Sequence, residues 1–112
     1  MIVRVLEGRV QSGRVTVFRQ QAKRVLEDAR REDGLVHAQI ARQVNADGGE
    51  EIIFVSVWRD LEALYGWLGT TDLLNTPVFN GGTFDVFEHF EVQHYEVCEL
   101  EAPEAVEAAK PV

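Results

Sequence analysis

The sequence predicts an α+β domain in which two helices cover one face of a four-stranded antiparallel sheet. The clearest observation is the segment 52–58, IIFVSVW, whose apolar residues occupy both faces of a strand, a pattern typical of a strand covered on both sides. A one-sided helix follows it directly, because apolar residues recur at helical spacing over 61–68. At 112 residues the chain is expected to hold one domain, residues 1–100, too small to supply many covering layers.

The other elements are predicted from periodicity and from turn residues. Ser12 and Asp60 are good caps for the two helices, and Gly34 suits a left-handed position that ends the first one. The alternation of the last strand changes phase, which a bulge near Gln93 and His94 would reconcile. The predicted elements are a strand at 1–10, a helix that follows the Ser12-Gly13 turn and ends at about 31, strands at 35–44 and 52–58, a helix at 61–68 and a strand at 89–99. The order β-α-β-β-α-β is that of the ferredoxin-like fold.

Composition excludes several classes of partner. The formal net charge of −8 disfavours nucleic acid and anionic membranes, since both need clustered Lys and Arg. No apolar run approaches the roughly 20 residues that span a bilayer. The single cysteine, Cys98, allows no intrachain disulfide, which fits a reducing cytoplasm. Residues 72–79 are expected to form a helical turn or two, and residues 101–112, which lack a packing pattern, a mobile acidic tail.

The sheet face away from the helices is also predicted to be apolar, through the first and third strands. Left uncovered, this face would expose several hundred Å² of apolar surface, at or beyond what monomers normally show. The simplest cover is the same face of a second copy, related by a two-fold axis. We therefore expect a homodimer.

The order and spacing of several motifs resemble the antibiotic biosynthesis monooxygenase family of dimeric α+β barrels. The motifs are Gln11-Ser12-Gly13 opening a helix that contains Phe18, Asp33-Gly34-Leu35 before the second strand, Val57-Trp58-Arg59-Asp60 before the second helix, and the closing strand 92–97. The resemblance implies a homodimer whose two sheets close into a barrel, with a small pocket between sheet and helices in each subunit. Some members of that family oxidise aromatic polyketides with oxygen and no cofactor, some degrade haem, and others have quinol oxidase-type activity or none established.

Two residues are the main candidates for chemistry. Trp67 lies at the edge of the apolar stripe of the second helix, where it lines a pocket mouth or is an ordinary edge-of-core aromatic or dimer contact. Glu7 shares strand parity with Val3 and Val5, so it points into the pocket if that face meets the helices. There a buried carboxylate could take a proton from a phenol or quinol; the alternative is a solvated residue at a strand end.

Tyr65, His37 and Phe79 complete the predicted substrate-binding residues, and His94 is a further pocket candidate on the sheet. No metal site is expected, because the histidines lack a metal-binding spacing. Trp67 matches the position of a tryptophan in the haem-degrading relatives, but Glu7 replaces their asparagine and no histidine occurs between Trp67 and His89. We therefore expect no haem and no other cofactor.

Two functions follow from these observations. The first is a cofactor-independent monooxygenase or related oxidoreductase that acts on a small aromatic, phenol-like or quinone-like substrate bound between sheet and helices. Such a protein need only bind, orient and deprotonate its substrate. The second is a non-catalytic dimeric module of the same fold that binds a small ligand or serves a structural role, since a fold alone does not decide between activities.

Overall fold

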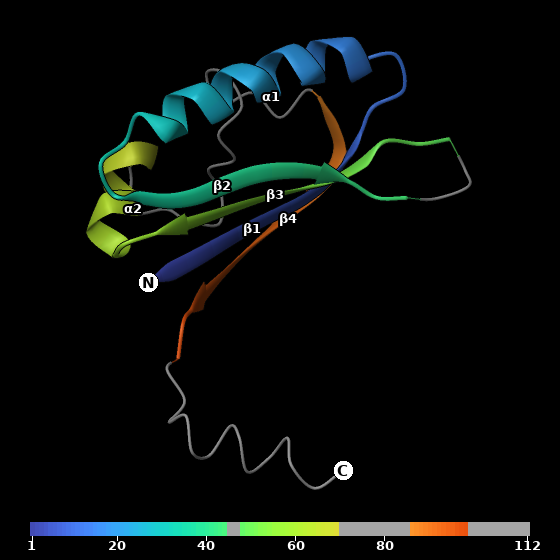
Figure 1. Ribbon diagram of the computed structural model, residues 1–112. Coiled ribbons are helices and arrows are strands. Elements are labelled where there is room, and N and C mark those ends of the chain that lie inside the picture. The colour runs from blue at the N-terminus through green and yellow to red at the C-terminus, as the bar shows by residue number, and fades with distance from the viewer. Residues whose placement is uncertain (45–47, 70–85, 99–112) are drawn as a thin grey trace, which may run out of the picture.

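The predicted order of elements is confirmed. The structure is a computed structural model that describes residues 1–44, 48–69 and 86–98. Its elements are β1 (Ile2–Val10), α1 (Val15–Arg30), β2 (Leu35–Arg42), β3 (Glu51–Trp58), α2 (Leu61–Leu68) and β4 (Phe87–Glu96). The four strands form one antiparallel sheet in the order β2-β3-β1-β4, and α1 lies along one side of it (Figure 1). This is the ferredoxin-like α+β architecture that the sequence predicts.

The two faces of the sheet are distinguished by strand parity. Leu6 lies opposite Phe54 on β3 and Val92 on β4, and all three are buried in the core cluster that also contains Phe18 of α1. We call this side the helix face. The next residue, Glu7, lies opposite Ile53 and Glu91, and because successive side chains alternate, this second set occupies the other side, which we call the open face.

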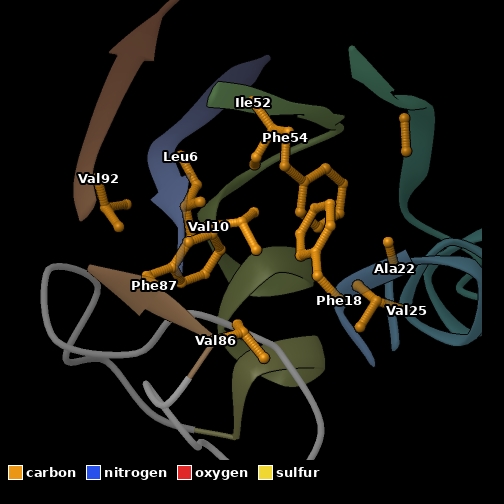
Figure 2. Packing of buried hydrophobic residues seen from close by; sticks show 11 residues of the cluster. Leu6, Val10, Phe18, Ala22, Val25, Ile52, Phe54, Val86, Phe87 and Val92 are labelled. Atoms are coloured by element: carbon orange, nitrogen blue, oxygen red, sulfur yellow. The ribbon is translucent and has the colours of Figure 1, made fainter. Parts of the chain in front are cut away.

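The main core lies between α1 and the helix face. Phe18, Ala22 and Val25 of α1 point toward Ile52 and Phe54 of β3 (Figure 2), at the four- and three-residue spacings that place side chains on one side of a helix. Phe18 also meets Phe87 edge-on, with ring centroids 5.9 Å apart. A second cluster of Ile2, Trp58 and Leu64 brings α2 onto the same face.

Local signals at the ends of the helices are partly confirmed. Asp60 caps α2 as predicted, since its Oδ1 accepts a hydrogen bond from the Ala63 backbone N at 2.9 Å. The expectation for Ser12 is wrong, because α1 begins after Arg14 and has no side-chain cap. Gly34 does not adopt a positive φ. It is required for close approach, since a Cβ there would collide with that of Ala63.

Irregular pairing occurs at two places that the sequence did not indicate. The β1–β4 register shifts between Arg9 and Val10, and the β2–β3 register shifts between Leu35 and His37. The predicted bulge near Gln93 and His94 is wrong, because both pair without interruption with Val5 and Arg4. The change of phase in β4 arises because apolar side chains such as Val92 and Tyr95 lie on different faces.

Some predictions lie outside the described residues: the helical turns at 72–79, the tail at 101–112 and Phe79. Of the two described helices, neither has the length and apolar character needed to cross a membrane.

Candidate functional site

A row of polar side chains crosses the helix face between apolar residues such as Ile2 and Leu6. Arg4 lies in the middle of β1, opposite Ser56 on β3 and His94 on β4. Arg4 and Ser56 are only 2% and 1% exposed. A guanidinium buried among apolar side chains is costly and uncommon, so this polar row is the first candidate for a functional site.

Arg4 and His94 interact directly. The Nη1 of Arg4 lies 3.0 Å from the Nε2 of His94. Because a guanidinium only donates hydrogen bonds, Nε2 accepts, and His94 is therefore the neutral tautomer that carries its proton on Nδ1. Such an imidazole can act as a proton acceptor.

The surroundings keep the two groups in these protonation states. Burial lowers the pKa of Arg4 to about 10, so the group still carries its charge at neutral pH. Burial, and then the charge of Arg4, lowers the pKa of His94 below its ordinary value near 6.5. A fixed cation and a neutral base thus lie side by side at neutral pH.

Two stacked indoles lie beside the polar row. Trp58 follows Ser56 on the same face of β3, on the diagonal from Arg4, a separation that long side chains can bridge. The rings of Trp58 and Trp67 stack with centroids 4.9 Å apart. Within residues 1–44, 48–69 and 86–98, the buried Nε1 of Trp58 has no hydrogen-bond acceptor. Arg4, Ser56 and Trp58 therefore concentrate donors in one region, which suits a ligand that carries oxygen acceptors.

Trp67 belongs to the packed side of α2. It contacts both core clusters and meets Phe54 edge-on, with centroids 6.2 Å apart. The helix packs through Leu64, Trp67 and Leu68, while Leu61 is 39% exposed. The packed stripe is therefore rotated toward Trp67 relative to the predicted one, and Trp67 joins the core to the polar row. Tyr65 is half-buried on the same helix. Binding of substrate by Trp67 and Tyr65 stays a prediction.

The expected location of Glu7 and His37 is wrong, because both lie on the open face. The residues of β1 that meet the helices are Ile2, Arg4 and Leu6, so Glu7 points to the opposite side. Glu7 does line a cavity of about 440 Å³, but this cavity lies toward one end of the sheet, with Ile53 and Glu91 also in its wall. A role for Glu7 as a base stays a prediction that now concerns the open face.

His37 is exposed, and its Nε2 lies 3.0 Å from Oε1 of Gln39, a neighbour on its own strand. It therefore lies apart from the polar row. The sequence analysis named His94 but missed Arg4. A signal for Arg4 was present, because it alternates with Ile2 and Leu6 and is therefore a charged residue on an apolar face of the first strand.

Metal binding finds no support in the described part of the chain. There, no group of three or more His, Cys, Asp or Glu side chains is arranged to hold a metal ion.

The fold defines a class of small α+β proteins with two helices on one face of a four-stranded antiparallel sheet. Comparison with known proteins identifies the family. The sequence model of the family described as antibiotic biosynthesis monooxygenase matches residues 1–76, more than half of the chain. The chain therefore belongs to the antibiotic biosynthesis monooxygenase family. No curated protein matches it.

Solved structures share the fold at low sequence identity. Rv0793 from Mycobacterium tuberculosis superposes with a TM-score of 0.70 at 19% identity, covering 90% of this chain and 97% of that one. SnoaB from Streptomyces nogalater, a cofactor-independent oxygenase, gives 0.65 at 15% identity, covering 90% and 96%. Protein SO0527 from Shewanella oneidensis gives 0.65 at 21% identity, covering 84% and 87%. At these identities the likeness establishes the fold alone.

Proposed function

We propose that this protein is a cofactor-independent monooxygenase that acts on a small phenol-like or quinone-like substrate bound between the sheet and the helices. The observation that carries the proposal is the contact between the buried Arg4 and the partly buried His94 on the helix face, 3.0 Å apart. Membership of the antibiotic biosynthesis monooxygenase family, together with the fold shared with SnoaB, supports the class of reaction.

The two side chains suit the first step of such a reaction. Nε2 of His94 accepts a hydrogen bond from Arg4 in the structure, so it becomes available as a base when a substrate oxygen takes over the N–H donors of Arg4. It then accepts the proton of an acidic hydroxyl or of the carbon next to a carbonyl. Arg4 then donates hydrogen bonds to the resulting oxyanion, which a fixed charge in a buried site stabilises strongly. The partly buried indole of Trp67, stacked on the fully buried Trp58, offers an aromatic surface for the substrate ring.

Oxygen then reacts with the carbanion of the substrate itself. A CH2 group of the substrate becomes a carbonyl, with one oxygen atom retained and the other released as water together with the two hydrogens. The carbon supplies all four electrons, so neither a reductant nor a metal enters the balance. The protein supplies binding, orientation and deprotonation.

A homodimer and a cytoplasmic location are parts of the same proposal. On the open face, valines from β1 and β3 form an apolar centre, and Tyr95 of β4 is 52% exposed. A second copy placed face to face would bury this surface without covering the helix face. The lone, exposed Cys98 suits a reducing compartment. Light scattering tests the assembly: a mass near 12.6 kDa at micromolar concentration contradicts it.

The test of activity measures oxygen uptake with a panel of hydroxylated anthrones, which carry the CH2 group that this step requires, corrected for uptake without protein. We expect His94→Asn and Arg4→Met to lower kcat/KM by about 100-fold or more, the usual contribution of a general base. The matched controls are His89→Asn, which alters an exposed histidine on the open face, and Arg24→Met, which alters an exposed arginine of α1. Both should stay within about twofold of the unmodified protein.

The same panel separates the helix face from the open face. Glu7→Gln should leave turnover unchanged if the reaction occurs at Arg4 and His94. Loss of activity in Glu7→Gln with retention in His94→Asn would move the reaction to the open face. Binding of the aromatic compounds without oxygen uptake would favour the second function, a non-catalytic ligand-binding module.

A further inference from the structure

A groove separates α1 from β2 at the edge of the sheet, and the proposed function does not use it. Its volume is about 500 Å³. One wall is formed by Phe18, Ala22 and Leu26, spaced by four residues along α1, and the other by Ile40 of β2 and Ile52 of β3. Leu26 and Ile40 are half-buried, so the apolar lining of this α1–β2 groove reaches the solvent.

Positive charge gathers at one end of the groove. Arg19 and Lys23 of α1 and Arg42 of β2 line it, together with a single carboxylate, Glu50. Glu50 is 8% exposed and stays ionised, because the hydrogen bonds from Arg19 lower its pKa. Three cations therefore face one anion, in a chain whose formal net charge is −8. This local excess of positive charge favours an anionic ligand.

The guanidinium groups retain donors for such a ligand. Arg19 uses Nε and Nη2 to hold the two oxygens of Glu50, at 3.0 and 2.9 Å. Nη1 of Arg42 lies 3.6 Å from Glu50, which is an ion pair but too long for a hydrogen bond. Both side chains are more than half exposed, so their remaining N–H groups can reach a carboxylate from solution.

The groove has the length of a short hydrocarbon chain. From Phe18 to Leu26 the helix rises about 12 Å, at 1.5 Å per residue. Beyond Leu26, Nη2 of Arg30 donates a hydrogen bond to the carbonyl oxygen of Ala38 at 3.2 Å, which ties α1 to β2 and bounds the groove. An elongated apolar body with its charge at the Arg19 end matches this shape.

The groove is distinct from the Arg4–His94 site. Arg42 shares a row of the sheet with Ile52 and Gly8, whereas Arg4 shares a row with Ser56 and Ala38. These rows are about 13 Å apart along the strands, and β1 and β2 are about 10 Å apart across the sheet. Because the groove lies at the helix side of the sheet, a second copy on the open face would leave it accessible.

We propose that the α1–β2 groove binds a single-chain amphiphile with an anionic head, such as a medium-chain fatty carboxylate, with the head at Arg19 and Arg42 and the chain along Ala22, Leu26 and Ile40. This site is independent of the proposed oxygenase activity. If the oxygenase activity is not found, the proposed ligand site in the groove is unaffected, and the reverse also holds.

The test titrates the isotopically labelled protein with decanoate below its micelle concentration and follows backbone amide chemical shifts. Shifts should concentrate at residues 18–26 and 40–42, with those at Arg4, Ser56 and His94 unchanged. Three probes separate charge from chain: acetate lacks the chain, decanol lacks the charge, and decyltrimethylammonium reverses it. We expect each to bind at least tenfold more weakly than decanoate.

Variants test the assigned contacts. Arg42→Gln and Leu26→Gln should each weaken decanoate binding by at least fivefold, while Arg24→Gln, an exposed position of the same helix outside the groove, should leave it unchanged. The binding result for Leu26→Gln counts only if the melting temperature shows that this variant is folded. If it unfolds, Arg42→Gln still tests the proposal, because that substitution removes only an exposed head group. Shifts confined to the Arg4 region, equal binding of the cationic probe, or no binding at millimolar decanoate would each overturn the proposal.

Discussion

Replacement of Arg4 by methionine should lower the activity of this protein without lowering its stability. Burial lowers the pKa of Arg4 from its ordinary value near 12.5 to about 10. Since a tenfold change in proton affinity corresponds to about 1.4 kcal/mol, keeping this charge in the folded protein costs about 3 kcal/mol. Methionine fills a similar unbranched volume without that charge.

The loss of hydrogen bonds opposes this gain. In Arg4→Met the Nε2 of His94, which is partly buried, loses its donor, and an acceptor left without a hydrogen bond costs at most about 1–3 kcal/mol. We therefore expect the free energy of unfolding of Arg4→Met to equal that of the unmodified protein or to exceed it by up to about 2 kcal/mol, as is common when buried ionic groups are replaced by apolar ones. The kcat/KM of Arg4→Met should still fall by about 100-fold or more.

The assay is urea unfolding at neutral pH, followed by the fluorescence of Trp58 and Trp67. Protein concentration is held constant, because the proposed homodimer makes stability depend on it. Arg24→Met is the control and should lie within about 0.5 kcal/mol of the unmodified protein. A decrease of more than about 1 kcal/mol in Arg4→Met would refute the reasoning, since it would mean that the buried guanidinium stabilises the fold.

The remaining predictions concern packing, pH and cofactor. Trp67→Ala should lower the free energy of unfolding by about 3 kcal/mol, because it removes the stack on Trp58; a thermal or urea unfolding curve close to that of the unmodified protein would contradict this. Gly8→Ala should cost about 1–3 kcal/mol by overpacking, because a Cβ there would lie 2.7 Å from the ring of Phe87, whereas Ala at the open Gly66 position serves as the control. The folded protein lowers the pKa of Glu50. The stability that this carboxylate contributes is therefore present above the ordinary Glu pKa near 4.3 and is lost as the pH falls through the lower pKa of the folded protein. Over that pH range, the urea midpoint of Glu50→Gln should fall less steeply than that of the unmodified protein. A haemin titration should give no sharp Soret shift, and loss of such a band with reductant and oxygen would show that the inference from the sequence is wrong.

Local patterns in the sequence were sufficient for the elements and their order. Alternation, helical spacing and the cap at Asp60 depend on neighbours a few residues away, so β3, α2 and their boundary were placed within about a residue of where the structure has them. The errors at Gly34 and Gln93 share another cause. From the local pattern alone, a glycine that allows close approach to α2 cannot be distinguished from a glycine that ends a helix. In the same way, a strand with apolar side chains on both faces cannot be distinguished from a strand with a bulge.

The candidate site was predicted less well, because it depends on the choice between two faces. A shift of one residue moves a strand side chain to the other side of the sheet, and the sequence offers apolar residues at both parities of β1. Placing Glu7 rather than Arg4 beneath the helices was therefore an error of parity alone. His94 was named as a candidate, but its partner on β1 lies 90 residues away in the chain and was not predicted.

The sequence by itself determined the α+β class, the element order and the family, because these follow from apolar periodicity and from the order of short motifs. Only the tertiary structure decided which face of β1 meets the helices, and with it that the buried Arg4 and Ser56 and the partly buried His94 form one row. It also brought Arg19, Arg42 and Glu50 together at the edge of the sheet. The physical reason is that burial and charge pairing arise when distant strands and helices assemble, and no local spacing encodes which of two apolar faces a helix will cover.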